Sequence, residues 1–222
     1  MRGILLDIEG TTTPISFVYD VLFPFARKHA AKHVLHADLS ELKREYDEDV
    51  RQKRNPPAWF PEPVAYIHWL MDQDRKSPAL KNIQGRIWLE GYQNGELHGE
   101  VFADVPPALQ RWHQNQIDIR IFSSGSILAQ RLLFSSTAAG DLTKFLSGYF
   151  DTTTGPKNDP ASYARIATSF DFPTTELLFI SDVTRELDAA RNAGMQTMLC
   201  MRPGNRPQPP NDHATITNFD GL

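Results

Sequence analysis

Four short runs rich in apolar and β-branched residues, three of which stop at a polar residue, constrain the fold more than any other feature. The runs are 3–6, 117–122, 177–180 and 197–201. A short apolar run of this kind is typical of a strand that is buried on both faces of a parallel sheet. Helical segments lie between the runs, such as the one that Asp159 and Pro160 open with a cap and a first-turn proline. This alternation predicts an α/β fold with a doubly wound parallel sheet.

A long segment with a different character separates the first two runs. Residues 16–99 contain no run that is typical of a strand, and residues 39–54 are dense in charged side chains, which indicates a solvated helix. We therefore predict an all-helical insertion at 16–99, carried by an α/β core that comprises residues 1–15 and 100–222. Residues 202–210 are rich in Pro and Asn, and we expect them to form a loop over the surface.

The composition excludes several classes of protein. The 222 residues are 41% hydrophobic and 23% charged, with a net charge of −4 and no run rich in Lys and Arg, so nucleic-acid binding is disfavoured. The apolar start is cut off by Asp7 and Glu9, too early for a signal peptide, and no run is long enough to span a membrane. The single Cys200 cannot form an internal disulfide, which fits a reducing compartment. We expect a cytoplasmic protein.

Polar side chains gather at the ends of the predicted strands. Ligands bind beyond the carboxyl ends of the strands in open α/β sheets, and the residues that this rule places at one rim are Asp7, Glu9, Ser123, Ser124 and Asp182. Lys157, in a loop ahead of a helix, can reach the same rim. Each residue alone also fits a role as a turn, cap or surface residue. Together, acidic strand ends, a hydroxyl and a lysine predict a site for Mg²⁺ and a phosphate group.

These residues resemble the four motifs of the haloacid dehalogenase-like (HAD) superfamily. The segment 7–12 (DIEGTT) follows one strand, Ser123 follows a second, Lys157 lies in a loop, and 181–182 (SD) follows a third. The helical insertion falls where that superfamily carries its C1-type cap. The sequence departs from the usual first motif at Glu9, which stands where the superfamily has a second Asp.

Three longer segments are similar to the enolase-phosphatases of methionine salvage, a family within that superfamily. They are 7–15 (DIEGTTTPI), 121–126 (IFSSGS) and 181–186 (SDVTRE). The similarity implies a substrate, 2,3-diketo-5-methylthiopentyl 1-phosphate. The enzyme would convert it through an enol-phosphate to the acireductone 1,2-dihydroxy-3-keto-5-methylthiopentene and phosphate. The alternative within the enzymes is a HAD phosphatase that acts on another small phosphate ester.

The resemblance also implies roles for particular residues. Asp7 would be the nucleophile that forms an aspartyl-phosphate, and Glu9 would transfer protons, although its extra methylene moves the carboxyl. The ligands of one Mg²⁺ per chain would be Asp7, Glu9 through its backbone carbonyl, and Asp182. Substrate and phosphate contacts would come from Ser123, Ser124 and Lys157.

Three points stay open in the sequence. Glu186 is either a partner of the site or an acid favoured by the start of its helix. The group that takes the carbon-bound proton in enolisation is either Glu9 or a residue of the insertion. A phospho-accepting receiver domain also carries an Asp near a strand end, but it is compact and has no such insertion. We expect a monomer that acts on a small-molecule phosphate ester, with neither nucleic acid nor membrane as a partner.

Overall fold

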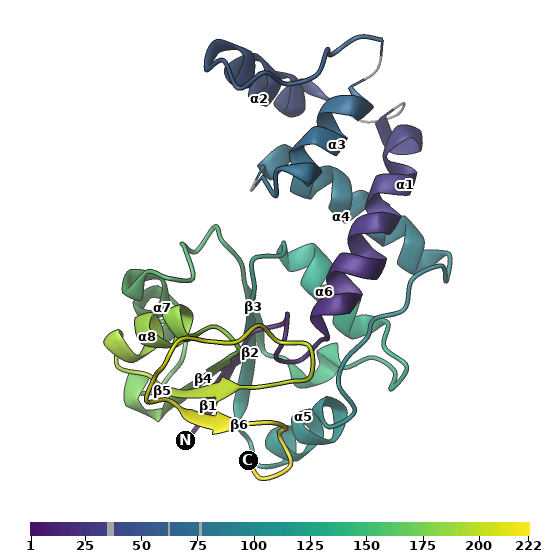
Figure 1. The fold of residues 1–222 in the computed structure, drawn as a ribbon. Coiled ribbons are helices and arrows are strands. Elements are labelled where there is room, and N and C mark those ends of the chain that lie inside the picture. Colours follow the sequence, from purple (N-terminus) through teal and green to yellow (C-terminus); the bar gives the residue numbers. More distant parts are fainter. Residues whose placement is uncertain (35–37, 62, 76) are drawn as a thin grey trace. The chain divides into compact units, whose positions relative to one another are not determined.

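The computed structural model describes residues 1–34, 38–61, 63–75 and 77–222. Residues 35–37, 62 and 76, which belong to the predicted insertion, lie outside the described residues. The chain divides into two compact units, one made of Met1–Val18 and His98–Leu222 and the other of Tyr19–Leu97 (Figure 1). Among the helices of the described residues, none combines the length and apolar content that crossing a bilayer requires.

The first unit is built on one sheet of six parallel strands in the order β3-β2-β1-β4-β5-β6. The strands are β1 (Gly3–Leu6), β2 (Asp118–Phe122), β3 (Gly148–Phe150), β4 (Leu177–Ser181), β5 (Gln196–Cys200) and β6 (Ala214–Ile216). The predicted doubly wound parallel sheet is confirmed, with the four expected strands in it. The strands β3 and β6, which have three residues each, were not predicted from the sequence.

Helices cover both faces of this sheet (Figure 1). They are α5 (Val105–Gln114), α6 (Ile127–Ser135), α7 (Pro160–Ala167) and α8 (Thr184–Asn192), with short 3₁₀ turns η2 (Thr143–Phe145) and η3 (Thr174–Glu176). Figure 1 shows α7 and α8 on one side and α5 and α6 on the other. The predicted start of α7 is correct, because the Asp159 side chain accepts a hydrogen bond from the Ala161 backbone N–H at 2.9 Å.

A hydrophobic core lies between the sheet and the layer formed by α7 and α8. Leu5, Phe122, Tyr163, Phe179 and Leu187 are all fully buried there. The rings of Phe122 and Tyr163 pack edge to face at 5.5 Å between centroids. All four residues of β1 are apolar and buried, so the first polar side chain of this segment is that of Asp7, directly after the strand. This polar side chain therefore lies at the carboxyl edge of the sheet.

Helices are the only regular secondary structure in the described residues of the second unit. Its helices are α1 (Phe23–Val34), α2 (Ser40–Arg51), α3 (Val64–Asp72) and α4 (Pro78–Gln93), and the π-helical turn η1 (Phe17–Leu22) runs across the boundary between the two units. Asp49 is buried in this unit, where it accepts hydrogen bonds from Tyr66 Oη at 2.8 Å and Arg54 Nη1 at 2.6 Å. Ser77 caps α4 by accepting a bond from the Leu80 backbone N–H at 2.9 Å.

Candidate active site

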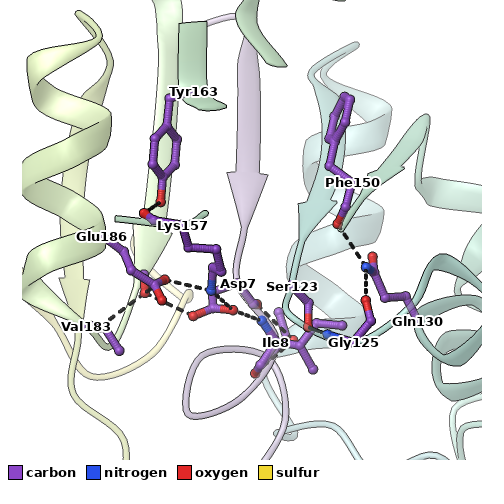
Figure 2. A network of polar contacts seen from close by, with 12 residues as sticks. Asp7, Ile8, Ser123, Gly125, Gln130, Phe150, Lys157, Tyr163, Val183 and Glu186 are labelled. Carbon is purple, nitrogen blue, oxygen red and sulfur yellow. Dashed lines mark hydrogen bonds and ion pairs between the residues drawn. The ribbon is translucent and has the colours of Figure 1, made fainter. Parts of the chain in front are cut away.

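Asp7 follows directly after β1, and both oxygens of its carboxylate are held. The residue is buried, with 2% of its surface exposed. Its Oδ1 accepts a hydrogen bond from the Ile8 backbone N–H at 2.7 Å and pairs with Lys157 Nζ at 2.6 Å. Its Oδ2 accepts a hydrogen bond from Ser181 Oγ at 3.0 Å. These contacts orient the Asp7 carboxylate at the carboxyl edge of the sheet (Figure 2).

Lys157 reaches Asp7 from the loop that precedes α7. Its Nζ lies 2.6 Å from Asp7 Oδ1 and 2.6 Å from Glu186 Oε2 (Figure 2). Tyr163 Oη donates a hydrogen bond to the Lys157 carbonyl at 2.7 Å, so α7 anchors the loop. Burial alone would lower the pKa of Lys157, but the negative charges of Asp7 and Glu186 outweigh it and raise that pKa above its usual value. The lysine therefore presents a positive charge at neutral pH.

Glu186 belongs to the same cluster, which settles the question that its sequence position left open. It stands in the first turn of α8, yet its carboxylate contacts Lys157 and accepts a hydrogen bond from Ser181 Oγ at 3.1 Å. Burial raises the pKa of Glu186 to about 7, although the charge of Lys157 opposes this shift. Ser181 has one hydroxyl proton for two carboxylates, those of Asp7 and Glu186, and so links them.

Asp182, the residue after β4, lies against the segment that carries Asp7. A Cβ on Gly10 would stand only 2.4 Å from Asp182 Oδ2, and Gly10 has a positive φ of 71°. Glycine is therefore required here both for its backbone conformation and for the close approach of the carboxylate. Burial and the negative charge of Asp7 raise the pKa of Asp182 to about 7. The structure thus brings the two predicted carboxylates to one place.

Ser123 and Ser124 follow β2, the neighbour of β1 in the sheet. Ser123 is buried, and its Oγ accepts a hydrogen bond from the Gly125 backbone N–H at 3.1 Å, which leaves the hydroxyl proton for a phosphoryl oxygen. Gln130 fixes this turn by donating to the carbonyls of Gly125 at 2.9 Å and Phe150 at 2.8 Å (Figure 2). The turn after β2 is therefore tied to the end of β3.

Glu9 is half-buried two residues after Asp7 and forms a backbone bridge with Thr13. Its negative charge contributes to the raised pKa of Lys157 and to that of Asp182. Glu9 therefore acts electrostatically on the same cluster of charged groups.

A pocket opens beside Lys157 within the α/β unit. Its volume is about 210 Å³, and its lining residues are Ser124, Thr152, Lys157, Asn158, Val183, Arg185 and Glu186. Two of these, Lys157 and Glu186, also belong to the cluster around Asp7, so a ligand in the pocket lies next to that cluster. The exposed guanidinium of Arg185 forms no ion pair with any residue that the structure describes. The pocket thus offers a cation without a partner among those residues.

The donor set fits Mg²⁺. Two carboxylates, those of Asp7 and Glu186, contact the ammonium of Lys157, and the charges of Glu9 and Asp182 act on the same cluster. Burial, and after it the negative charges of this cluster, raise the pKa of Asp182. Within the described residues, no three His, Cys, Asp or Glu side chains form a complete metal site. A hard octahedral cation needs no such set, because it keeps several waters and is bound through one or two carboxylates and substrate oxygens.

Three further residues shape the site without having been predicted as part of it. Ser181 had a signal in the sequence, since it precedes Asp182 at a strand end. Tyr163 and Gln130 act by donating hydrogen bonds to backbone carbonyls of distant loops, and no local sequence pattern reports such contacts. The sequence therefore predicted the charged groups and missed the groups that orient them.

Comparison with known proteins agrees with this geometry. Residues 1–194 match the family model described as haloacid dehalogenase-like hydrolase. The chain is 49% identical to the protein named enolase-phosphatase E1 of Synechococcus elongatus, over 99% of this chain and 96% of that protein. It is 45% identical to a Vitis vinifera protein named as a probable bifunctional methylthioribulose-1-phosphate dehydratase/enolase-phosphatase E1, over 100% of this chain and 47% of that protein. The crystal structure of the UTR4 protein of Saccharomyces cerevisiae superposes with a TM-score of 0.82 at 34% identity, covering 100% of this chain and 99% of that one.

Proposed function

Because the chain belongs to the haloacid dehalogenase-like hydrolases and, within them, to the enolase-phosphatases, we propose that it is a Mg²⁺-dependent phosphatase that first enolises its substrate. The substrate is 2,3-diketo-5-methylthiopentyl 1-phosphate. Enolisation gives an enol-phosphate, and hydrolysis then gives the acireductone 1,2-dihydroxy-3-keto-5-methylthiopentene and inorganic phosphate. This assigns the chain a step of methionine salvage.

The observation that carries this proposal is the contact between Lys157 and Asp7. A buried carboxylate paired at 2.6 Å with a buried ammonium is an anionic nucleophile beside a cation that can receive phosphoryl oxygens. The second carboxylate on this lysine, Glu186, holds it from the other side. Attack by an anion on a phosphate dianion requires such positive charge at the phosphoryl group.

In the proposed phosphatase step, a carboxylate oxygen of Asp7 attacks the phosphorus, and the bond from phosphorus to the ester oxygen breaks. The carboxyl of Glu9 gives its proton to the departing oxygen, and the Asp7 acyl-phosphate remains. Glu9 then takes a proton from a water molecule that attacks the phosphorus, which releases phosphate and restores Asp7. Lys157 and Ser123 hold the phosphoryl oxygens throughout. Mg²⁺, held by Asp7, Asp182 and the Glu9 carbonyl, would supply positive charge for these oxygens and polarise a substrate ketone.

The enolase step needs a place for the carbon chain next to the phosphate. The residues that line the pocket of about 210 Å³ beside Lys157 include the polar residues Ser124, Asn158 and Arg185. We assign the two ketone oxygens of the substrate to this pocket, where Arg185 stabilises the negative charge that develops on an oxygen when the neighbouring carbon loses a proton.

A relative supports the choice of substrate. The Vitis vinifera protein combines, by its name, a methylthioribulose-1-phosphate dehydratase with an enolase-phosphatase, and this chain matches about half of its length. Removal of water from methylthioribulose 1-phosphate gives a diketo-methylthiopentyl phosphate. An enzyme that acts next would receive the substrate proposed here.

The test supplies the diketo phosphate to the purified chain with Mg²⁺ and follows two signals, the ultraviolet absorbance of the enol products and the release of inorganic phosphate. We expect enol absorbance and phosphate to appear together, with both lost when Mg²⁺ is chelated. Phosphate release from other small esters, with no enol absorbance from the diketo phosphate, would favour the alternative of a general HAD phosphatase. Turnover that is unaffected by chelation would contradict the role of Mg²⁺.

A further inference from the structure

The loop between β5 and β6, residues 201–213, does more than cross the surface. The sequence predicts a surface loop at 202–210, and this prediction is wrong for Arg202, which is 6% exposed. Side chains from the loop reach the segment 7–13 that carries Asp7 and the start of α8 that follows Asp182. Figure 1 shows this loop in yellow, between the arrows of β5 and β6.

Arg202 anchors one end of the loop. Its guanidinium donates two hydrogen bonds of 2.8 Å to the carboxylate of Asp104 and others to the carbonyls of Thr217 at 3.0 Å and Thr11 at 3.2 Å. The charges of the arginine and Asp104 are both largely buried, at 3% and 13% side-chain exposure. Loss of either partner would leave a buried charge without compensation, so this ion pair maintains the fold.

Asn205 bonds to the same segment, at the carbonyl of Gly10, the residue before Thr11. Its Nδ2 donates to the Gly10 carbonyl at 2.9 Å and to the Cys200 carbonyl at 3.1 Å. A Cβ on Gly10 would stand 2.9 Å from Asn205 Oδ1 and 2.4 Å from Asp182 Oδ2. The amide of Asn205 and the carboxylate of Asp182 therefore pack against the same side of the Gly10 α-carbon.

Gln208 connects the loop to the other carboxylate-bearing segment. Its Oε1 accepts hydrogen bonds from the Thr184 backbone N–H at 3.1 Å and from Thr184 Oγ1 at 3.2 Å. Helix α8 begins at Thr184, and the residue before it, Val183, has an apolar side chain that cannot cap the helix. Gln208 therefore supplies the missing cap two residues after Asp182.

We propose that Asn205 and Gln208 are positioning residues that hold the Asp7 and Asp182 segments at a fixed separation and thereby set the affinity of the site for Mg²⁺. The inference rests on the proposed function, since it takes Asp7 and Asp182 to be metal ligands. The ligands come from loops after two different strands, and one short loop makes hydrogen bonds to both segments. Side chains that orient metal ligands from outside the coordination sphere typically change metal affinity by roughly 10- to 100-fold when they are removed.

The test measures Mg²⁺ dissociation constants by isothermal titration calorimetry on the full chain and on the variants Asn205→Ala and Gln208→Ala. The control is Asn211→Ala, because Asn211 is exposed in the same loop and, among the described residues, its amide bonds only to the neighbouring Pro209 carbonyl and His213 N–H. The thermal midpoint of each variant without Mg²⁺ is recorded as a separate readout of folding.

We expect each of the two variants to bind Mg²⁺ roughly 10-fold more weakly or worse, and Asn211→Ala to bind it like the wild type. If Asn205→Ala does not fold, Gln208→Ala decides, because Gln208 bonds to the start of α8 and not to the segment that carries Asp7. A lowered thermal midpoint with dissociation constants within about twofold of the wild type would overturn the inference and leave the loop a purely structural brace. A wild-type chain that binds no Mg²⁺ would overturn the proposed function as well, and the two failures are thereby distinguished.

Discussion

Among the single residues of the site, Glu9 departs from the superfamily, because a glutamate stands where the superfamily carries an aspartate. It stands two residues after Asp7, and its charge acts on both Lys157 and Asp182. Its side chain is one methylene longer than the Asp that the superfamily carries at this position. In the proposed mechanism, the proton is therefore delivered to the departing oxygen from a longer side chain.

Glu9→Gln tests this role, because the amide keeps the size of the side chain but cannot transfer the proton. We expect kcat for phosphate release to fall by about 10²- to 10⁴-fold, with KM within a few-fold of the wild type. Steady-state kinetics with the diketo phosphate and with p-nitrophenyl phosphate measures both constants. The Mg²⁺ dissociation constant should change little, since the backbone carbonyl of residue 9 is the expected ligand. A kcat close to that of the wild type would remove Glu9 from the mechanism.

Arg185 should select the natural substrate. Arg185 lines the pocket, and a charge-assisted hydrogen bond from its guanidinium to a ketone or enolate oxygen would be worth about 1.5–3 kcal/mol. We therefore expect Arg185→Ala to lower kcat/KM for the diketo phosphate by roughly 10- to 100-fold, and to lower it much less for p-nitrophenyl phosphate, which lacks the ketones.

The matched control for this prediction is Arg191→Ala in the same helix. Arg191 pairs with Asp188 and Asp212, and it does not line the pocket. Equal losses of kcat/KM for both substrates in Arg185→Ala, or the same loss in Arg191→Ala, would show that Arg185 does not recognise the ketones.

At the scale of the elements, the buried Asp49 of α2 stabilises the helical unit through hydrogen bonds with residues outside this helix. Burial would raise the pKa of Asp49, but hydrogen bonds from Tyr66, Arg54 and Arg75 outweigh burial and hold that pKa below its usual value. An acid whose pKa is lowered by folding stabilises the fold above its unfolded pKa, and this stabilisation is lost as the pH falls through the folded pKa.

We therefore expect Asp49→Ala to destabilise the protein by about 1–3 kcal/mol at neutral pH, since it removes the carboxylate that pairs with Arg54 and Arg75 and leaves the buried Tyr66 hydroxyl without an acceptor. The two arginines are partly exposed and can be solvated, which limits the cost. Chemical denaturation at neutral pH and near about pH 3 measures the effect. A loss that is as large at the acidic pH as at neutral pH would contradict the assigned ion pairs.

The elements also show which parts of the fold a sequence can predict. The strands β1, β2, β4 and β5 have four or five residues and apolar patterns that are visible locally. The strands β3 and β6 have only three residues, none of them fully buried. Such short edge strands carry no periodicity, and their pairing is decided by neighbours that are distant in the chain.

The site shows the same division. Asp7, Ser123 and Asp182 were predictable because each stands where a recognisable strand ends, and Lys157 because it lies in a loop just ahead of a helix, a position that the resemblance then matched. The contact of Asn205 with Gly10 joins residues that are 195 positions apart. Its geometry depends on how the loop after β5 folds back, which no local pattern reports. Residues that carry charge at strand ends are visible in a sequence, whereas residues that orient them are not.

For the whole molecule, Mg²⁺ binding should depend on pH with a definite sign. The protein raises the pKa of Asp182 and that of Glu186 to about 7, mainly through burial. A bound dication favours the ionised carboxylates, so binding releases protons and strengthens as the pH rises through 7. Calorimetric titrations in buffers of different ionisation enthalpy, at about pH 6 and about pH 8, count the protons released. Equal affinity at both pH values with no proton release would contradict the clustered carboxylates.

The most direct test of the central claim is to trap the phosphorylated enzyme. The chain is mixed with the diketo phosphate and Mg²⁺, quenched in acid during turnover and reduced with borohydride, which converts an aspartyl-phosphate to homoserine. Peptide mass spectrometry then locates the change, with Asp7→Asn as the control. We predict homoserine at position 7 in the wild type and none in the variant, which should also release no phosphate. A phosphoryl group found on Ser123 or Ser124, or undiminished turnover by Asp7→Asn, would contradict the claim that Asp7 is the nucleophile.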